Sequence, residues 1–262
     1  MTQPPIRFDD GAAYDRSMGA WSRLAGDVFL DWLAPASGLR WLDVGCGSGA
    51  FSARVLERAA PAELQGIDPS AAQIEFAASR VPGGTFQVGD AMALPFPADR
   101  FDVAIMALVI FFVPDPAKGV AEMARAVRPG GQVAAYAWNI NEGGFPFRHV
   151  QAAAQTLGAT PVRPPSAGAE RMEALQALWQ GAGLESIETH TISVRRSFAD
   201  FEAYWQSSTV TGGTRALLAK LSEAERGVLR DRVNEALPRD EEGRISYLSH
   251  ANAIKGRVPS GR

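Results

Sequence analysis

The stretch "WLDVGCGSGAFS", Trp41 to Ser52, ends an apolar run at Asp43 and then places glycines at alternate positions. These are Gly45, Gly47 and Gly49, and a helical pattern begins directly after them. A glycine-rich turn between a strand and a helix brings backbone N–H groups close to a ligand. The loop also matches the dinucleotide fingerprint G-x-G-x-x-G/A. Whether it binds a dinucleotide, a nucleoside triphosphate or another ligand has to be decided from the rest of the chain.

Composition and charge narrow the class of protein. The 262 residues are 46% hydrophobic and 21% charged, which suits one large α/β domain. The net charge of −3 and the scattered basic residues argue against a nucleic-acid partner. A single cysteine, Cys46, excludes an intrachain disulfide, and the three histidines lie far apart, so we expect no metal. We expect a cytoplasmic protein with no membrane span, because no apolar run reaches ~18 residues.

Strand and helix patterns alternate along the first half of the chain. Helices are predicted over Ala20–Leu33 and Ala50–Ala60, from the N-cap Ser70 to about Arg80, and after Asp115 and Pro116. Strands are predicted at Arg40–Val44, Glu63–Ile67, Thr85–Val88, Phe101–Met106 and Val133–Trp138, with a turn at Arg128–Gln132 before the last one. This alternation predicts a doubly wound, mostly parallel α/β sheet.

Three acidic residues help to identify the ligand. No lysine lies near Gly49, which excludes a Walker A loop. Asp68 ends the second strand, where a dinucleotide site has its ribose-binding acid. Asp43 stands beside the phosphate position, where it would repel a pyrophosphate but would suit an α-amino group. Asp90 follows the third strand, where its carboxylate can accept a hydrogen bond from an adenine amino group.

Four motifs follow one another within Trp41 to Trp138, namely "LDVGCGSG", "GIDPS", "GDAMALPF" and "ARAVRPGG". In this order they resemble the class I S-adenosylmethionine-dependent methyltransferases, in particular the ubiquinone/menaquinone-biosynthesis group. A weaker resemblance includes "YDRSMGAWSR" and the "FEAYW" segment. The resemblance implies a seven-stranded Rossmann-like sheet in the order 3-2-1-4-5-7-6, with strand seven antiparallel. It also implies S-adenosyl-L-methionine as cofactor.

The same resemblance divides the chain into one domain with three parts. Residues 15–138 would bind the cofactor, 139–182 and 198–238 would cover the carboxyl ends of the strands, and 184–196 and 244–256 would form the last two strands. Cofactor contacts are implied for the glycine loop, the three acids and the end of strand four. The residues are Tyr14, Asp43, Gly45, Cys46, Gly47, Gly49, Asp68, Pro69, Asp90, Ala91, Met106 and Ala107.

Aromatic residues are predicted to line the acceptor pocket. Phe111 and Phe112 stand where many relatives carry a polar pair, so no base is expected there, and the catalytic residue stays unknown. Of the histidines, His149 alone follows the loop after strand five. Trp138, Phe145 and Tyr204 complete the predicted pocket. We expect methyl transfer to O, N or C of a small, partly apolar molecule, and a homodimer paired through the last strand is a further hypothesis.

Two other interpretations stay open at this point. A non-catalytic module of the same fold would bind S-adenosylmethionine, or a partner protein, without turnover. An NAD(P)-linked oxidoreductase would use the glycine loop for a dinucleotide, although the chain carries no Tyr-x-x-x-Lys pair or other hydride-transfer signature.

Overall fold

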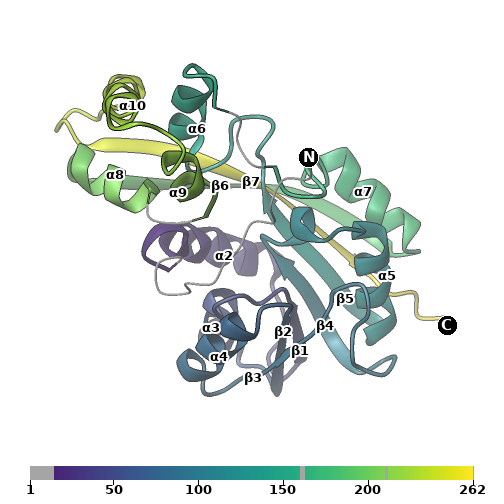
Figure 1. Cartoon of the computed structure of the whole chain (residues 1–262). Helices are drawn as coiled ribbons and strands as arrows, with labels where there is room; N and C mark the ends of the chain where they lie inside the picture. Colours follow the sequence, from purple (N-terminus) through teal and green to yellow (C-terminus); the bar gives the residue numbers. More distant parts are fainter. Residues whose placement is uncertain (1–14, 160–162, 210–211, 262) are drawn as a thin grey trace.

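The computed structural model describes residues 15–159, 163–209 and 212–261 (Figure 1). Its seven-stranded sheet has the order β3-β2-β1-β4-β5-β7-β6, and β7 runs antiparallel to both of its neighbours. The strands are β1 Arg40–Val44, β2 Glu63–Asp68, β3 Thr85–Val88, β4 Phe101–Ala107, β5 Val127–Trp138, β6 Glu185–Phe198 and β7 Ile245–Arg257. The predicted fold class and strand order are confirmed.

Helices cover both faces of this sheet (Figure 1). On one face lie α2 (Ala20–Leu33), α3 (Ala50–Ala59) and α4 (Ala71–Arg80), and on the other α5 (Pro116–Ala126) and α7 (Met172–Gly181). The buried apolar residues accordingly form two clusters, one beside α2 and α3 and one beside α5 and α7. Strands buried on both faces are continuous apolar runs, which is why β4 reads "FDVAIMA".

Local capping explains where two helices begin. The Ser70 hydroxyl accepts a hydrogen bond from the Gln73 N–H at 3.4 Å, so Ser70 caps α4. Asp115 Oδ1 accepts from the Lys118 N–H at 3.1 Å, and Pro116 follows at the first helical position. Both starts were predicted from the sequence, because caps depend only on neighbouring residues.

The segment "RPGGQ" continues β5 instead of forming the predicted turn. Gly130 has a φ of 76° and its N–H donates to Val258 O at 2.8 Å, so this end of β5 pairs with the chain just after β7. The register against β4 shifts between Phe101 and Val103. The glycines therefore form a bulge, in which a positive φ is used without leaving the sheet.

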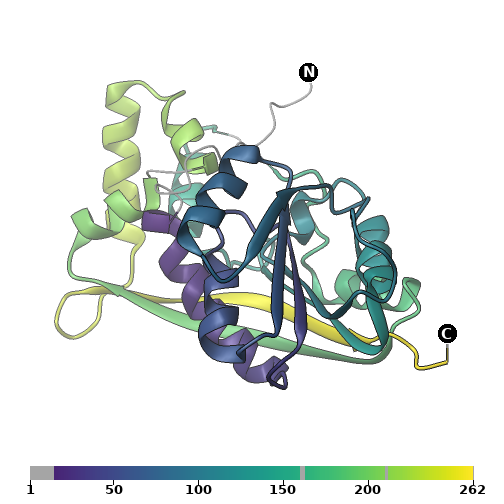
Figure 2. The same ribbon diagram turned by 90° about the horizontal axis from the view of Figure 1, so that it is seen from below.

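The last two strands run well beyond the rest of the sheet (Figure 2). The ladder between β5 and β7 ends where Trp138 pairs with Ala251, whereas β6 and β7 stay paired up to Phe198 and Ile245. We call residues 193–198 and 245–250 the β6–β7 arm. Beside it lie α6 (Arg148–Gln155), α8 (Phe201–Thr209), α9 (Gly212–Leu218) and α10 (Glu223–Ala236) (Figure 1).

Segment 139–182 does not act as one cover over the strand ends, which corrects the expectation for its second half. Helix α6 lies near the arm, but α7 packs on the sheet face beside α5. Leu175 and Trp179 are fully buried there, and the Trp179 indole N–H donates to Val133 O at 3.0 Å. This hydrogen bond fixes the position of α7 against β5, which the amphipathic pattern of the helix does not predict.

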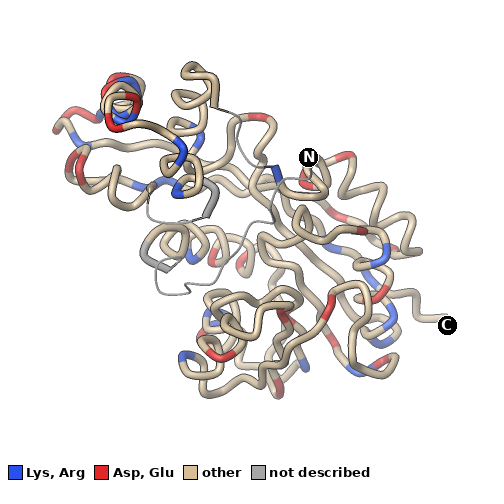
Figure 3. Tube along the Cα trace, in the orientation of Figure 1, with Lys and Arg blue, Asp and Glu red and all other residues tan. Residues whose placement is uncertain are grey.

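Charged residues of both signs are interspersed along the fold (Figure 3). No helix in the described part of the chain is both long enough and apolar enough to cross a membrane.

Candidate functional site

The glycine loop joins β1 to α3 at the carboxyl edge of the parallel strands. Gly45, Gly47 and Gly49 have φ values of 76°, 50° and 74°. The N–H groups of Gly45 and Cys46 both donate to Ile67 O, at 2.8 and 2.9 Å, which ties the loop to β2. A Cβ on Gly45 would lie 2.5 Å from Val109 Cγ1, whereas one on Gly47 would meet nothing within 4 Å. A side chain at position 45 would therefore collide with Val109, whereas position 47 borders open space.

Asp43 has a buried carboxylate in which only one of the two oxygens accepts a hydrogen bond from a described side chain. Asp43 lies one residue before the end of β1 and is 2% exposed. The Ser52 hydroxyl donates to its Oδ2 at 2.6 Å. Oδ1 is buried and has no hydrogen-bond partner among the described residues. Burial raises the pKa of Asp43 to about 7, the Ser52 hydroxyl opposes this rise, and the nearby Asp68 adds to it. A cationic ligand group would satisfy this oxygen.

Asp68 is held by two backbone N–H groups at the end of β2. Oδ2 accepts from Gly47 at 3.0 Å and Oδ1 accepts from Ser70 at 2.9 Å. Burial raises the pKa of Asp68, and the two N–H groups oppose that rise. Each oxygen keeps a further lone pair, so the carboxylate can still accept two hydroxyl groups. Pro69 follows it and is exposed.

The third acid, Asp90, follows β3 and is exposed. Its Oδ1 accepts from the Met92 N–H at 2.8 Å, an Asx turn that fixes the loop after the strand. Ala91 is half-buried, and its carbonyl oxygen and Met106 Cε both approach Gly119 on α5. The Met106 side chain is therefore buried on the α5 face, and Ala107 ends the strand beside it.

Two residues near these strand ends were not predicted. Ser52 lies in the first turn of α3 and its hydroxyl donates a hydrogen bond to Asp43. Its place on the helix face toward β1 could have indicated this contact from the sequence. Leu108, directly after β4, has a φ of 64°, and its N–H donates to Tyr136 O at 2.8 Å. A bulky residue in the left-handed region is strained by about 1–3 kcal/mol, which surrounding packing must offset. Nothing in the sequence indicates it.

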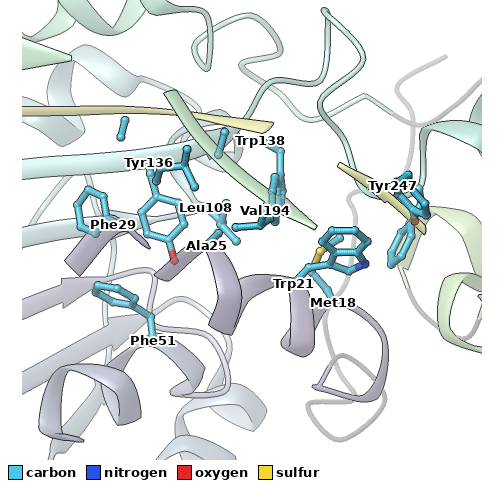
Figure 4. Packing of buried hydrophobic residues seen from close by; sticks show 14 of the residues in the cluster. Met18, Trp21, Ala25, Phe29, Phe51, Leu108, Tyr136, Trp138, Val194 and Tyr247 are labelled. Atoms are coloured by element: carbon cyan, nitrogen blue, oxygen red, sulfur yellow. The ribbon is translucent and has the colours of Figure 1, made fainter. Parts of the chain in front are cut away.

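The five predicted acceptor residues fall into two separate groups. Phe111 and Phe112, with ring centroids 4.6 Å apart, belong to the cluster on the α5 face. Trp138 and Tyr204 belong to the cluster on the α2 face, and Phe145 packs against it. Figure 4 shows part of this cluster, including Trp138, Trp21 and Tyr247. The structure thus brings three of the predicted residues together and leaves the phenylalanine pair apart from them.

The remaining predictions concern Tyr14, histidine and metal. Tyr14 lies outside the described residues. His149 is half-buried at the start of α6, its Nε2 lacks a described hydrogen-bond partner, and burial lowers its pKa to about 4, with Arg148 acting in the same direction. Within residues 15–159, 163–209 and 212–261, no group of three His, Cys, Asp or Glu side chains is arranged to hold a metal ion.

Comparison with known sequences finds similar proteins for the part of the chain that holds the glycine loop and the three acids. Residues 42–135 match the family described as a methyltransferase domain. An uncharacterized methyltransferase of Mycobacterium tuberculosis is 30% identical over 139 residues, 52% of this chain and 56% of that protein. A ubiquinone/menaquinone biosynthesis C-methyltransferase of Dinoroseobacter shibae is 35% identical over 125 residues, 45% of this chain and 50% of that protein. The match spans about half the length of these relatives.

Solved structures show the same fold over nearly the whole chain. Phosphoethanolamine N-methyltransferase 2 of Haemonchus contortus superposes with a TM-score of 0.60 at 19% identity, covering 95% of this chain and 57% of that one. A [4+2]-cyclase, SpnF, gives a TM-score of 0.58 at 22% identity, covering 100% and 89%. At these identities the likeness describes the fold alone.

The sheet order and its helices define a Rossmann-like methyltransferase fold. The part of the chain that matches the methyltransferase domain model, residues 42–135, contains the glycine loop, Asp43, Asp68 and Asp90.

Proposed function

We propose that this chain binds S-adenosyl-L-methionine at the carboxyl ends of β1 to β4 and transfers its methyl group to a small molecule. The observation that supports this most is the buried Asp43 carboxylate, whose Oδ1 has no hydrogen-bond partner among the described residues. Gly47, four residues further along, borders open space. A ligand with an ammonium group would complete this carboxylate. S-adenosylmethionine has such a group and supplies an electrophilic methyl on a sulfonium.

Each residue of the site would contact one part of the cofactor. Asp43 would bind the ammonium group, and Asp68 would accept both ribose hydroxyls through the lone pairs that Gly47 and Ser70 leave unused. The Asp90 carboxylate and the Ala91 backbone would bind the adenine. The backbone after Met106 would contact the methionine portion. Related structures support this proposal, since Haemonchus contortus phosphoethanolamine N-methyltransferase 2 is described in complex with S-adenosyl-L-methionine.

Catalysis would rest on positioning rather than on a base. Holding a nucleophile in line with the methyl and its leaving group can contribute several kcal/mol to lowering the barrier. The separation of Phe111 and Phe112 from the α2 face favours Trp138, Phe145 and Tyr204 as the acceptor side. We infer an O, N or C nucleophile on a partly apolar small molecule. The last strand, β7, is paired with β5 and β6 on its two sides, so it does not offer the free edge that the dimer hypothesis assumed. Homodimerisation itself stays a prediction for light scattering.

Calorimetry and turnover together test the proposal. Wild type should bind S-adenosylmethionine and S-adenosylhomocysteine, Asp43→Asn should bind both more weakly, and NAD should not bind. A panel of small apolar acceptors should then release S-adenosylhomocysteine. Cofactor binding with no release over the panel would favour the non-catalytic interpretation, which matters because this fold also occurs in a protein described as a [4+2]-cyclase.

A further inference from the structure

Arg196 is a charged residue in an otherwise apolar row on the β6–β7 arm. Side chains alternate between the two faces of a strand, and Ile192, Val194 and Phe198 occupy the buried face of β6. Arg196 is separated from each of these three residues by an even number of positions, so its side chain lies on the same face of β6. It pairs with the buried Tyr247 of β7. The guanidinium is therefore directed to the side on which α2 and α8 pack.

Two aromatic rings lie close to the Arg196 guanidinium. Its Cζ lies 4.5 Å from the Phe198 ring centroid and 5.8 Å from that of Trp21. One nitrogen donates to Ser17 O at 3.3 Å. Burial lowers the pKa of Arg196, with Arg23 acting in the same direction and Tyr247 opposing, but a guanidinium stays charged at neutral pH.

Arg196 forms no ion pair with an Asp or Glu side chain in the described part of the chain. A cation taken partly out of water is costly unless an anion faces it. A guanidinium accommodates a carboxylate with two parallel hydrogen bonds, and one carbonyl contact leaves most of its donors available. The ligand that best completes this site is therefore an oxyanion.

Three further buried donors come from α2, β5 and β7. Trp21 Nε1, Trp138 Nε1 and Ser249 Oγ are buried without a hydrogen-bond partner among the described residues. The Trp21 ring lies 5.3 Å from that of Tyr247 and 6.4 Å from that of Trp138, so it connects the arm with the end of β5 (Figure 4). Indole N–H groups donate only, so they suit oxygen atoms on a bound molecule.

We propose that Arg196 is the anion-recognising residue of the acceptor site, and that the acceptor is an aromatic or otherwise apolar small molecule bearing a carboxylate. The guanidinium would bind the carboxylate, and the Phe198 and Trp21 rings beside it would contact the apolar body. This inference rests on the proposed methyltransferase function, whose cofactor site is at the neighbouring strand ends.

A purely structural role gives a different expectation. If Arg196 served only to tie β6 to Ser17, its replacement would lower the melting temperature without changing which ligands bind. Arg195 is the matched control, because it carries the same charge one position away and is exposed on the opposite face, where it lies 3.5 Å from Ser246 Oγ.

The test compares acids with their neutral amides. Benzoate, 4-hydroxybenzoate and indole-3-acetate are titrated beside their primary amides into protein saturated with S-adenosylhomocysteine, and tryptophan fluorescence is followed. Wild type should bind at least one acid about tenfold or more tightly than its amide, as expected for a charge-assisted contact. Arg196→Gln should lose this preference and Arg195→Gln should keep it. Arg196→Lys should retain the charge but bind the acid more weakly than wild type.

Two controls separate the possible failures. Calorimetry with S-adenosylhomocysteine is run on every variant, and absence of binding to wild type would refute the proposed function and this inference with it. Normal cofactor binding with no acid preference in wild type would overturn the inference alone, as would an acid preference that survives in Arg196→Gln. If Arg196→Gln does not fold, an unchanged acid affinity in Arg196→Lys overturns it.

Discussion

The backbone N–H of Gly47 donates to the carboxylate of Asp68 at 3.0 Å, which joins the loop after β1 to the end of β2. The same carboxylate accepts from Ser70, the N-cap of α4. Asp68 therefore fixes the glycine loop in addition to any contact with a ligand. Effects of substitutions in the loop and at Asp68 should not be additive, because the two share a hydrogen bond.

Asp68→Asn is expected to weaken S-adenosylmethionine binding by roughly 1.5–3 kcal/mol, since it removes the negative charge that strengthens two hydroxyl contacts. Asp68→Ala should lose more, because Gly47 N–H also loses its acceptor. Calorimetry with a thermal melt measures both effects. Glu75→Gln, an exposed acid on α4, is the control and should bind normally. Unchanged affinity in a folded Asp68→Asn protein would contradict the ribose assignment.

Asp43 should couple cofactor binding to pH. Its pKa of about 7 means that the ligand-free carboxyl is about half protonated at neutral pH, and a bound ammonium favours the ionised form. Binding between pH 6 and 7 should therefore release a proton, and affinity should be about fivefold weaker at pH 6 than near pH 7.5, above which the ligand's own α-amino group loses its proton. Calorimetry in buffers of different ionisation enthalpy counts this proton. A flat affinity between about pH 6 and 7.5 would argue against the ammonium contact.

The raised pKa of Asp43 also determines how the stability of the ligand-free protein changes with pH. A carboxyl whose pKa rises from 3.8 to about 7 on folding binds its proton more tightly in the native state, so the ligand-free fold loses stability as pH rises between these values. The loss is at most about 4 kcal/mol. Asp43→Asn should flatten this slope in urea denaturation while it weakens cofactor binding. If the unfolding free energy of Asp43→Asn depended on pH as steeply as that of wild type, another titrating group would be responsible for the pH dependence.

Gly45 and Gly47 should differ in their response to a methyl group. Gly45→Ala places a Cβ 2.5 Å from Val109 Cγ1, and we expect a loss of about 1–3 kcal/mol in unfolding free energy from overpacking. Gly47→Ala meets no atom within 4 Å and should cost only about 1 kcal/mol from its positive φ. The double variant Gly45→Ala/Val109→Ala should recover part of the loss. Equal losses for both single variants, with no recovery, would contradict the packing argument.

What the sequence predicted well depended on local rules. The helix starts at Ser70 and Asp115 follow from capping, and the loop after β1 follows from its glycines. The position of α7 depends on the Trp179 contact with β5, and the strain at Leu108 depends on its bond to Tyr136, so neither was predicted. Arg196 was within reach of sequence reasoning, because it interrupts an alternating row of apolar residues.

Asp90 should read the adenine amino group. Asp90→Ala is expected to weaken S-adenosylmethionine binding by about 1–2 kcal/mol, from one lost hydrogen bond and a freed Met92 N–H. A cofactor analogue without the amino group should bind wild type and variant about equally. The matched control is Asp99→Ala, an exposed acid farther along the same connection to β4. A variant that prefers the amino-bearing cofactor as strongly as wild type would rule out Asp90.

His149 should be dispensable for the chemical step. Burial lowers its pKa to about 4, so it is neutral at pH 7 but too weakly basic to take a proton efficiently. Once an acceptor is known, His149→Ala should lose less than about tenfold in turnover at saturating substrate, whereas a positioned general base typically contributes 10²–10⁴-fold. His250→Ala, on β7, is the control.

The lowered pKa of His149 gives a second measurement that does not need an acceptor. Since the unfolded chain binds a proton at the ordinary value of 6.5, the native state should lose stability as pH falls from 6.5 toward 4. His149→Gln should therefore be less acid-sensitive than wild type in thermal melts over this range. A loss of turnover beyond a hundredfold with intact cofactor affinity would instead make His149 the base.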